Sequence, residues 1–542
     1  MTGGPPGEDS RGWTQKQQRA ETKQLTHKAT LSKPGSKTEQ DKRLPLADAI
    51  NEQHHLEIAS FHTPGHKGIS ADAGAGTTWH FDVTELPGLD ELSNPSGPIH
   101  LLEERAAKTW GAKASFISVN GASAALIAAI LACSGRGKNI LLPRNVHKSA
   151  VHALVMSGLE PIWFEPNFDQ DWNVWTNVSN TTIEKQIQKN PDNFAAIVVV
   201  SPTYAGCSSD IHELAATAHR YGIPLIVDEA HGAHRVLDSA MPPSAVTQGA
   251  DAVVHSLHKT LSALTQTGLL HVPSGSLIDA NSASAALNLL QSSSPSYLLM
   301  ASIERCISDL QPGSETLGNL KVRSAEFAQR LNSLGDIEVF VPPFGTPEPT
   351  HFLVRMAGVG ATQLADACRA RGIFSEAVLG EGVLFLAGVG TSTVDFESLL
   401  RVLKNVREER AAGSAAVLGG TKARPAVSGS TTNSPSCNAR PIGFDDENNG
   451  ATTADKSTDD CLAALLFSFG EQSLSPREAF FSTVETVSSE HAVGRISADC
   501  FAPCPPGTPV LVPGQRITHE VVSFCRKPLY RVVVESSIQG EQ

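Results

Sequence analysis

The chain has 542 residues, of which 40% are hydrophobic and 18% charged, so it can bury a large core. It carries 43 Lys and Arg against 56 Asp and Glu. The resulting net charge of -13 argues against a nucleic-acid-binding protein, which would normally be basic. No run of about 18 apolar residues predicts a membrane span, and the N-terminus lacks the apolar core of a secretory signal. The nine cysteines form no CxxC pair, which is typical of reduced thiols in a cytoplasmic protein.

The first 44 residues differ from the rest of the chain. Residues 1–44 are polar and turn-rich, with nine Lys and Arg against five Asp and Glu. Because such a segment cannot offset its ordering entropy by burial, we expect a disordered tail. The alternative is an organelle transit peptide, such as one for a plastid. The five acidic residues count against it, since transit peptides are poor in acids.

From about residue 105 to residue 275, short apolar runs alternate with helical segments. The predicted strands are Ala114–Val119, Ile140–Leu142, Ala195–Val200, Leu225–Val227, Ala252–Val254 and Gly268–Val272. The predicted helices between them are Ala122–Cys133, Lys148–Ser157 and Ile211–Tyr221. This alternation is typical of βαβ units and predicts an α/β fold with a mostly parallel sheet buried on both faces.

The remaining chain divides by composition. Residues 285–335 look helical. A small α+β domain is expected from the strands His351–Met356 and Val383–Ala387 and the helices Thr362–Arg371 and Phe396–Glu409. Small and polar residues dominate 410–458, which predicts a disordered insertion. Further on, the pattern predicts helices at Leu462–Phe469 and Pro476–Phe481 and strands at Ala492–Ala498 and Val510–Val512. The expected domains are therefore 45–335, 336–409 and 459–530.

Polar side chains follow three of the predicted strands, and ligands collect at the carboxyl ends of strands in open parallel sheets. Asp228 follows one apolar strand, and Lys259 follows another, with Ser256 and His258 just before it. An isolated Lys there would most often be a surface residue. A Lys combined with a carboxylate is what pyridoxal phosphate requires, because the amine forms the Schiff base and the acid keeps the pyridine nitrogen protonated.

With these residues in place, the sequence resembles the pyridoxal-phosphate-dependent Orn/Lys/Arg decarboxylases of fold type I, from about residue 45 to 525 apart from the insertion. The segments that carry the resemblance are Thr63–Lys67, Gly88–Leu92, Arg144–Ser149, Ser256–Lys259, Ser294–Tyr297 and Ser475–Phe481. It implies an aspartate-aminotransferase-like large domain, a small α+β domain and a C-terminal decarboxylase domain. The match is to the short form, without an N-terminal response-regulator-like domain.

The resemblance also implies roles for individual residues. Lys259 forms the Schiff base with the cofactor, Asp228 pairs with its pyridine nitrogen, and His147 stacks on its ring. Ser256 and His258 contact the phosphate.

Further expected contacts come from other loops. The turn Gly121-Ala122-Ser123 precedes a helix, so its N–H groups and the Ser123 hydroxyl can hold a phosphate. Thr203 supports the region of the ring hydroxyl. His231 is expected either to orient Asp228 or to be a buried structural histidine.

The implied reaction is decarboxylation of arginine, lysine or ornithine to the corresponding amine and CO2, with Lys259 or His258 as proton donor. Substrate choice stays open. Gln515 stands where the family commonly has Glu, which removes a charge that could pair with a basic side chain. The other acids considered are Asp90, Glu91 and Glu520, each of which is otherwise an ordinary surface charge.

Two other functions remain. An aminotransferase or another fold-type-I lyase could use Arg355 to bind a substrate carboxylate, unless Arg355 is a surface residue. A pseudoenzyme that binds a polyamine or a homologous subunit would not need Lys259 with Asp228.

The segment Ser292–Tyr297 resembles a family loop that reaches the cofactor site of the neighbouring subunit, which predicts a homodimer or higher homo-oligomer. Ser296 is also expected to cap a helix that starts near Tyr297.

Overall fold

The structure is a computed structural model and describes residues 44–55, 79–190, 193–237, 241–310, 320–411, 470–504 and 506–534. Four predictions concern segments outside these ranges: the tail 1–44, the motif Thr63–Lys67, the insertion 410–458 and the helix Leu462–Phe469. Of these segments, the structure describes only residue 44 and residues 410–411. Within the described ranges, no helix combines the length and apolarity that a membrane span requires.

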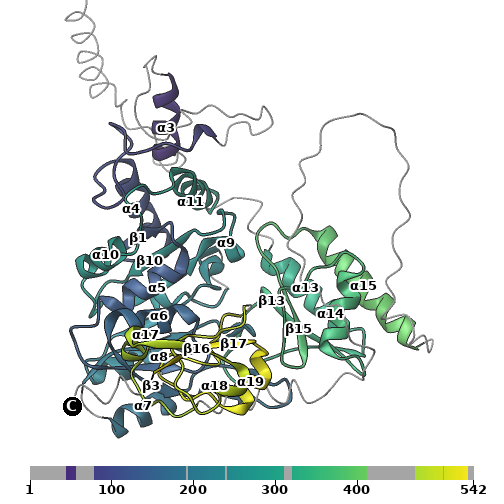
Figure 1. Ribbon diagram of the computed structural model, residues 1–542. Helices are drawn as coiled ribbons and strands as arrows, with labels where there is room; N and C mark the ends of the chain where they lie inside the picture. The colour runs from purple at the N-terminus through teal and green to yellow at the C-terminus, as the bar shows by residue number, and fades with distance from the viewer. Residues whose placement is uncertain are drawn as a thin grey trace, which may run out of the picture.

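A seven-stranded sheet forms the centre of the large domain (Figure 1). In spatial order its strands are β1 (Ala114–Ser118), β10 (Gly268–Val272), β9 (Ala252–Ser256), β8 (Leu225–Asp228), β6 (Phe194–Val200), β2 (Asn139–Pro143) and β3 (Glu160–Phe164). The last five run parallel to one another, whereas β10 is antiparallel to both its neighbours. The six predicted strands are confirmed. The edge strand β3 was missed, because most of its residues are only half-buried.

Alternate side chains of each strand enter different cores, as the pleat requires. Leu225 and Val227 pack in one cluster with helices α4 (Pro98–Trp110) and α8 (Ile211–Arg220). Ile226, between them, packs in a second cluster with α5 (Gly121–Leu131), α6 (Lys148–Ser157) and α10 (Ala280–Asn288). The sheet is therefore buried on both faces, which explains its continuous apolar runs.

The small domain lies beside the sheet on the right of Figure 1. Its antiparallel sheet has the order β11 (Ile337–Val339), β13 (His351–Met356), β15 (Gly382–Leu386) and β14 (Ala377–Leu379). Its helices are α13 (Leu320–Asn332), α14 (Ala361–Arg369) and α15 (Thr393–Ala411). The predicted strands and helices of this region are confirmed within a few residues. Helix α13 packs on β11 and α15, although it lies within the range assigned to the large domain.

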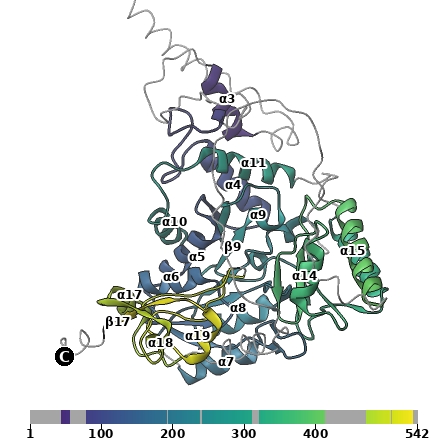
Figure 2. The same ribbon diagram turned by 45° about the vertical axis from the view of Figure 1, so that its right-hand side comes forward.

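The C-terminal region packs against α6 of the large domain (Figures 1 and 2). It contains α17 (Pro476–Phe481), β16 (Val484–Ser488), α18 (Ser489–Ala492), α19 (His519–Cys525) and β17 (Leu529–Val533). Arg477 on α17 donates to the carbonyl oxygens of Val155 and Met156 at the end of α6, at 3.2 and 2.7 Å. These bonds use carbonyl groups that the helix end leaves unpaired.

The predicted strand Ala492–Ala498 is wrong. Ala492 ends α18, and only Ile496 and Ser497 form isolated bridges. Ile496 and Ala498 are buried against Ala479 rather than in a strand ladder, which is why they resembled a strand in sequence. The predicted strand Val510–Val512 is likewise reduced to a single bridge at Leu511, and the actual pair, β16 with β17, was missed.

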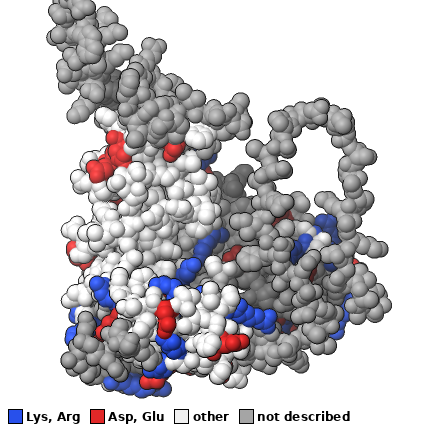
Figure 3. Space-filling view, viewed as in Figure 1, with Lys and Arg blue, Asp and Glu red and all other residues white. Residues whose placement is uncertain are grey.

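Charged side chains are distributed unevenly over the face shown in Figure 3. Lys, Arg, Asp and Glu are interspersed over its lower part, where the C-terminal region lies, and are sparse higher up around α4, α5 and α10. The described residues on this face therefore form no continuous basic surface of the kind that binds nucleic acid.

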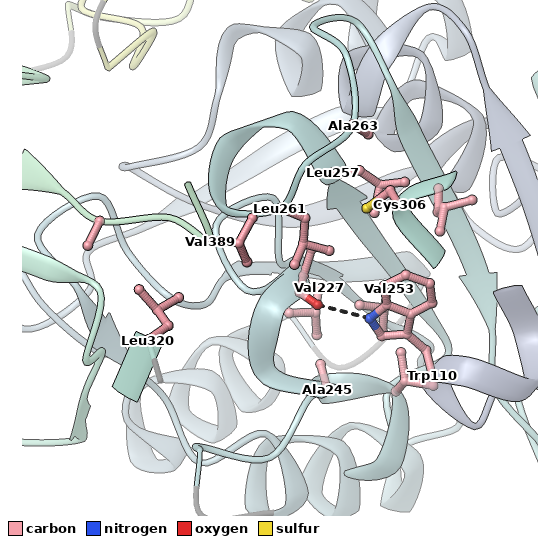
Figure 4. Packing of buried hydrophobic residues seen from close by; sticks show 14 of the residues in the cluster. Trp110, Val227, Ala245, Val253, Leu257, Leu261, Ala263, Cys306, Leu320 and Val389 are labelled. Atoms are coloured by element: carbon pink, nitrogen blue, oxygen red, sulfur yellow. Dashed lines mark hydrogen bonds between the residues drawn. The ribbon is translucent and has the colours of Figure 1, made fainter. Parts of the chain in front are cut away.

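Trp110 packs in the core cluster that contains residues of β8 and β9 (Figure 4). Its indole N–H donates to the carbonyl oxygen of Ala233 at 3.1 Å, so the buried ring leaves no unpaired donor. Val227 and Val253 lie beside it in the same cluster. This packing fixes the strands that end at Asp228 and Ser256.

Candidate active site

A pocket of about 540 Å³ opens at the carboxyl ends of β6, β8 and β9. The residues predicted to bind the cofactor or to act in catalysis all line it: Gly121, Ala122, Ser123, His147, Thr203, Asp228, His231, Ser256, His258 and Lys259. Two further walls come from distant parts of the chain, with Val378 and Leu379 from the small domain and Pro506, Thr508 and Phe524 from the C-terminal region. The site is thus enclosed by all three parts of the fold.

Lys259 lies in α9 (Leu257–Thr260), a single turn that directly follows β9. Its Nζ is 2.9 Å from Nε2 of His231. Burial lowers the pKa of Lys259, and the charges of Asp228 and Glu376 oppose that effect. A lowered pKa increases the fraction of Lys259 in the neutral, nucleophilic amine form.

Asp228 ends β8 and is 8% exposed. Among the described residues, its carboxylate accepts one hydrogen bond, from the Ala230 N–H to Oδ1 at 3.1 Å. A carboxylate has room for about four hydrogen bonds, so most of its capacity is left for a ligand in the pocket. A protonated pyridine nitrogen is a donor of the type this oxygen pair accepts.

His147 caps the N-terminus of α6, where its Nδ1 accepts from the Ser149 N–H at 3.3 Å. Gly507 of the C-terminal region packs against the opposite edge of the ring, which carries Cδ2 and Nε2. It has φ +81, and a Cβ there would lie 2.7 Å from His147 Cδ2, so both the backbone angle and the space require glycine. The ring is therefore held in one orientation by the C-terminal region.

The expected phosphate cup lies at the start of α5. Its N-cap residue, Asn120, makes no side-chain capping bond, so the first N–H groups of this eleven-residue helix are not capped by Asn120. Ser123 and Ser256 bring hydroxyl groups to the same pocket. Together with Lys259 and Asp228, these donors fit pyridoxal phosphate, which needs an amine, an acid and an anion site.

His258 is held by the backbone. Its Nδ1 donates to the Thr267 carbonyl oxygen at 3.1 Å, and burial lowers the pKa of the ring although that hydrogen bond opposes it. The lowered pKa favours the neutral ring, in which the proton donated to Thr267 lies on Nδ1. Only the Nε2 lone pair remains for the pocket.

The expectation for His231 changes in the structure. Its hydrogen bonds go to Lys259 and to His351 of the small domain, rather than to Asp228. The turn that follows β8 carries the ring past the strand end and beside the lysine. Thr203 lines the pocket, and its hydroxyl accepts from the Cys207 N–H at 3.2 Å.

Tyr204 lines the pocket and was missed by sequence analysis, as was its partner Glu376, which lies outside the pocket lining. The Tyr204 hydroxyl donates to Glu376 Oε1 of the small domain, and its ring packs edge-on against His231 with ring centres 4.9 Å apart. Tyr204 follows a strand end, which was the available signal. Glu376 comes close only through folding.

The acids considered for the substrate lie elsewhere. Asp90 accepts from the N–H groups of Ser96, Gly97 and Ile99, and so caps α4. Glu91 and Glu520 are exposed.

Gln515 and Arg355 are also outside the pocket lining. Gln515 is 1% exposed and accepts from the Val512 N–H at 3.1 Å, so it stabilises a turn. Arg355 pairs with Asp171 and Glu338 at 2.7 and 2.6 Å. It also stacks on Trp172 at 4.2 Å, so its guanidinium is already bound by the protein.

Residues 44–348 match the family model described as the major domain of Orn/Lys/Arg decarboxylase, and residues 459–527 match the model of its C-terminal domain. The protein YaaO of Bacillus subtilis, described as uncharacterized, is 34% identical, over 92% of this chain and 96% of its own. An arginine decarboxylase of Bacillus anthracis is 30% identical, over 90% of this chain and 93% of its own.

Solved structures agree in fold. Lysine decarboxylase A from Pseudomonas aeruginosa has a TM-score of 0.72 at 21% identity, covering 89% of this chain and 75% of its own. The constitutive lysine decarboxylase of Escherichia coli has a TM-score of 0.68 at 20% identity, covering 90% and 77%.

Proposed function

Because this chain belongs to the Orn/Lys/Arg decarboxylase family, we propose that it removes the α-carboxylate of arginine, lysine or ornithine to give the amine and CO2. It is a carboxy-lyase that uses pyridoxal phosphate. The observation that carries the proposal is that one pocket holds both Lys259, whose pKa is lowered by burial, and the Asp228 carboxylate, which accepts only one hydrogen bond from the described residues.

Pyridoxal phosphate supplies the electron sink that takes up the electron pair of the broken Cα–carboxylate bond. Lys259 provides the amine to which the cofactor attaches. Asp228 would hold a proton at the pyridine nitrogen, and His147 would lie against the ring. The α5 N-terminus, Ser123 and Ser256 would bind the phosphate and so fix the position of the cofactor in the pocket.

The structure supports Lys259 rather than His258 as the group that returns a proton to Cα. His258 already donates its Nδ1–H to Thr267, and its lowered pKa disfavours a second proton on Nε2. Lys259 Nζ carries protons in both its charged and its neutral form.

Selectivity for a basic side chain is proposed to come from Glu376. Its neighbours Val378 and Leu379 line the pocket, and its negative charge opposes the lowering of the Lys259 pKa, so its field reaches the reactive end. Tyr204 holds it by a hydrogen bond. A cationic substrate group would be attracted to this side of the pocket.

The test is an assay of the purified protein with added pyridoxal phosphate and arginine, lysine or ornithine, measuring amine and CO2. Formation of amine with an equal amount of CO2 supports decarboxylation. Keto-acid formation would instead support an aminotransferase, which the engaged Arg355 disfavours. Absence of any borohydride-trapped cofactor on Lys259 would support a pseudoenzyme.

We further propose a cytoplasmic homodimer with shared sites. All the described cysteines are free, as expected for a reducing compartment.

Ser296 caps α11 (Tyr297–Asp309) as predicted, while residues 292–294 are exposed and do not line this chain's own pocket. The apolar side chains of Leu289, just after α10, and of Leu101, in α4, are 81% and 48% exposed. Such a surface suits an interface core.

The shared site is tested by mixing two inactive proteins, Lys259→Ala and a variant of Ser292–Ser294. Partial recovery is expected, because one site of a mixed dimer contains both intact halves. No recovery after demonstrated subunit exchange would refute the shared site.

A further inference from the structure

Two imidazoles from different domains form a hydrogen-bonded chain that ends on Lys259. The distance from Lys259 Nζ to His231 Nε2 is 2.9 Å, and that from His231 Nδ1 to His351 Nε2 is 3.3 Å. His351 Nδ1 lies 3.1 Å from Thr350 Oγ1. His351 opens strand β13, so the chain joins the small domain to the reactive lysine of the large domain.

The members of this chain are shielded from water. His231 and His351 are 5% and 7% exposed, and Thr350 is fully buried. Burial lowers the pKa of His351 to about 3, and burial together with the Lys259 charge lowers the pKa of His231 well below 6.5. Both rings are therefore neutral at neutral pH, and each has one N–H donor and one acceptor nitrogen.

The protonated form of Lys259 sets the direction of the chain. An ammonium group has donors only, so His231 must accept at Nε2 and carry its proton on Nδ1. That proton is then donated to His351 Nε2, and the His351 Nδ1–H is donated to the Thr350 hydroxyl oxygen. Each buried donor thus has an acceptor, provided that His351 is present.

We propose that His351 is a positioning residue for the reactive lysine, acting through His231. By accepting the His231 Nδ1 proton, it keeps the Nε2 lone pair directed at Lys259 Nζ. Without that acceptor, the ammonium form would leave a buried N–H unpaired, and the ammonium form becomes less stable. Removing the acceptor should therefore lower the pKa of Lys259. The inference rests on the proposed role of Lys259.

Other ionisable groups around the chain are unchanged by a substitution at position 351. Those acting on Lys259, His231 and His351 are Asp228, Glu376, Cys504, His147, His234, His258, Glu348 and Arg235. Because the His351 ring is neutral, replacing it with Leu or Gln removes no charge. A change in the Lys259 pKa then reports the lost acceptor.

The experiment measures the pKa of Lys259 in the full-length, cofactor-free protein. Trace acetylation from about pH 6 to about pH 11, with mass spectrometry of the Lys259 peptide, gives the fraction of neutral amine, and Lys113 serves as the internal standard. His351→Leu should lower the pKa by about one pH unit. His351→Gln should retain nearly the wild-type value, because its amide oxygen can accept the same proton.

A matched control is the second buried histidine pair. His271 Nε2 lies 3.0 Å from His255 Nδ1, and both rings are fully buried. His271→Leu removes a similar contact away from the lysine, so it should leave the Lys259 pKa unchanged. An unchanged pKa in His351→Leu, or an equal fall in the Leu and Gln variants, would overturn the inference.

Thr350→Val keeps the test decisive if His351→Leu does not fold. It removes the far acceptor at nearly constant volume, so a smaller fall of the pKa is expected, and no fall overturns the inference. The wild-type assay for amine separates this inference from the proposed function. A pKa fall in a protein that makes no amine refutes only the function, and amine production without a pKa fall refutes only the inference.

Discussion

Asp228 and Glu229 are neighbours in sequence but lie in opposite environments. Asp228 faces the pocket with one hydrogen bond from the protein. Glu229 is fully buried, and it accepts from Arg235 at 2.8 Å, His255 at 2.7 Å and the Ala245 N–H at 3.0 Å. Ser244 also donates to it. Glu229, whose oxygens accept several hydrogen bonds from the protein, is structural. Asp228, which accepts only one from the described residues, is available to a ligand.

The network around Glu229 extends under the site. Arg235 also pairs with Glu348 at 2.8 Å, and Glu348 pairs with His234 at 2.8 Å. Its members are held by one another, so it can support the strand ends without entering the pocket. A buried network of this kind is strongly disturbed when one partner is lost. Substitutions on the pocket side should therefore change catalysis, and those in the network should change stability.

The largest effect is expected for Lys259→Ala. No multiple turnover should remain, because a methyl group cannot attach the cofactor. The thermal unfolding midpoint should stay near that of wild type, since Lys259 Nζ lies in the pocket. Steady-state assays and calorimetry measure the two quantities, and sustained turnover by the variant would refute the assignment.

Asp228→Ala should come next and should act on rate alone. Loss of a charge-assisted contact in a dry site should lower kcat by about 100- to 1,000-fold. Unfolding should change little, because only the Ala230 N–H loses its partner. An unchanged kcat would mean that Asp228 is structural.

Glu229→Gln should show the opposite behaviour. It leaves the buried Arg235 with one anionic partner in place of two, so the free energy of unfolding should fall by about 3 kcal/mol. Denaturant unfolding in comparison with Asp228→Ala measures this. If Glu229→Gln and Asp228→Ala lower the free energy of unfolding equally, the division into a structural and a ligand-binding acid is wrong.

Glu348 should make stability depend on pH. Although burial opposes it, the neighbouring His234 and Arg235 lower the pKa of Glu348 from 4.5 to about 2. Its folded pKa lies below its unfolded value, so its stabilisation is present above pH 4.5 and is lost as pH falls toward about 2. The loss should reach about 3 kcal/mol. Glu348→Gln should flatten this part of the stability curve, and an identical curve would contradict the assignment.

The smallest effect is expected for Glu376→Gln. Because Glu376 is exposed, loss of its charge should raise KM for a basic substrate by about twofold to fivefold with little change in kcat. Tyr204→Phe, which keeps the charge but removes the holding hydrogen bond, should have a smaller effect on KM. An unchanged KM in Glu376→Gln would exclude it as the acid that selects the substrate.

Much of the large domain could be predicted because its signals are local. Apolar runs such as Leu225–Val227 are continuous since both faces of the sheet are covered, and polar residues follow them at the strand ends. Asp228 and Lys259 could be placed in one pocket because parallel neighbouring strands end at the same edge. The pattern in the C-terminal region is weaker. There the apolar residues around Ile496 predicted a strand, although they are buried outside any strand ladder.

By itself, then, the sequence determined the α/β class, the strands of the central sheet, the family resemblance and the lysine–acid pair, because each is signalled by short runs such as an apolar strand and the polar residue that follows it. Only the tertiary structure decided the partners of His231, the capping role of Asp90 and the approach of Glu376. These depend on contacts between residues far apart in sequence, such as His231 with His351. Hydrogen bonding and burial select such partners only after the domains have packed.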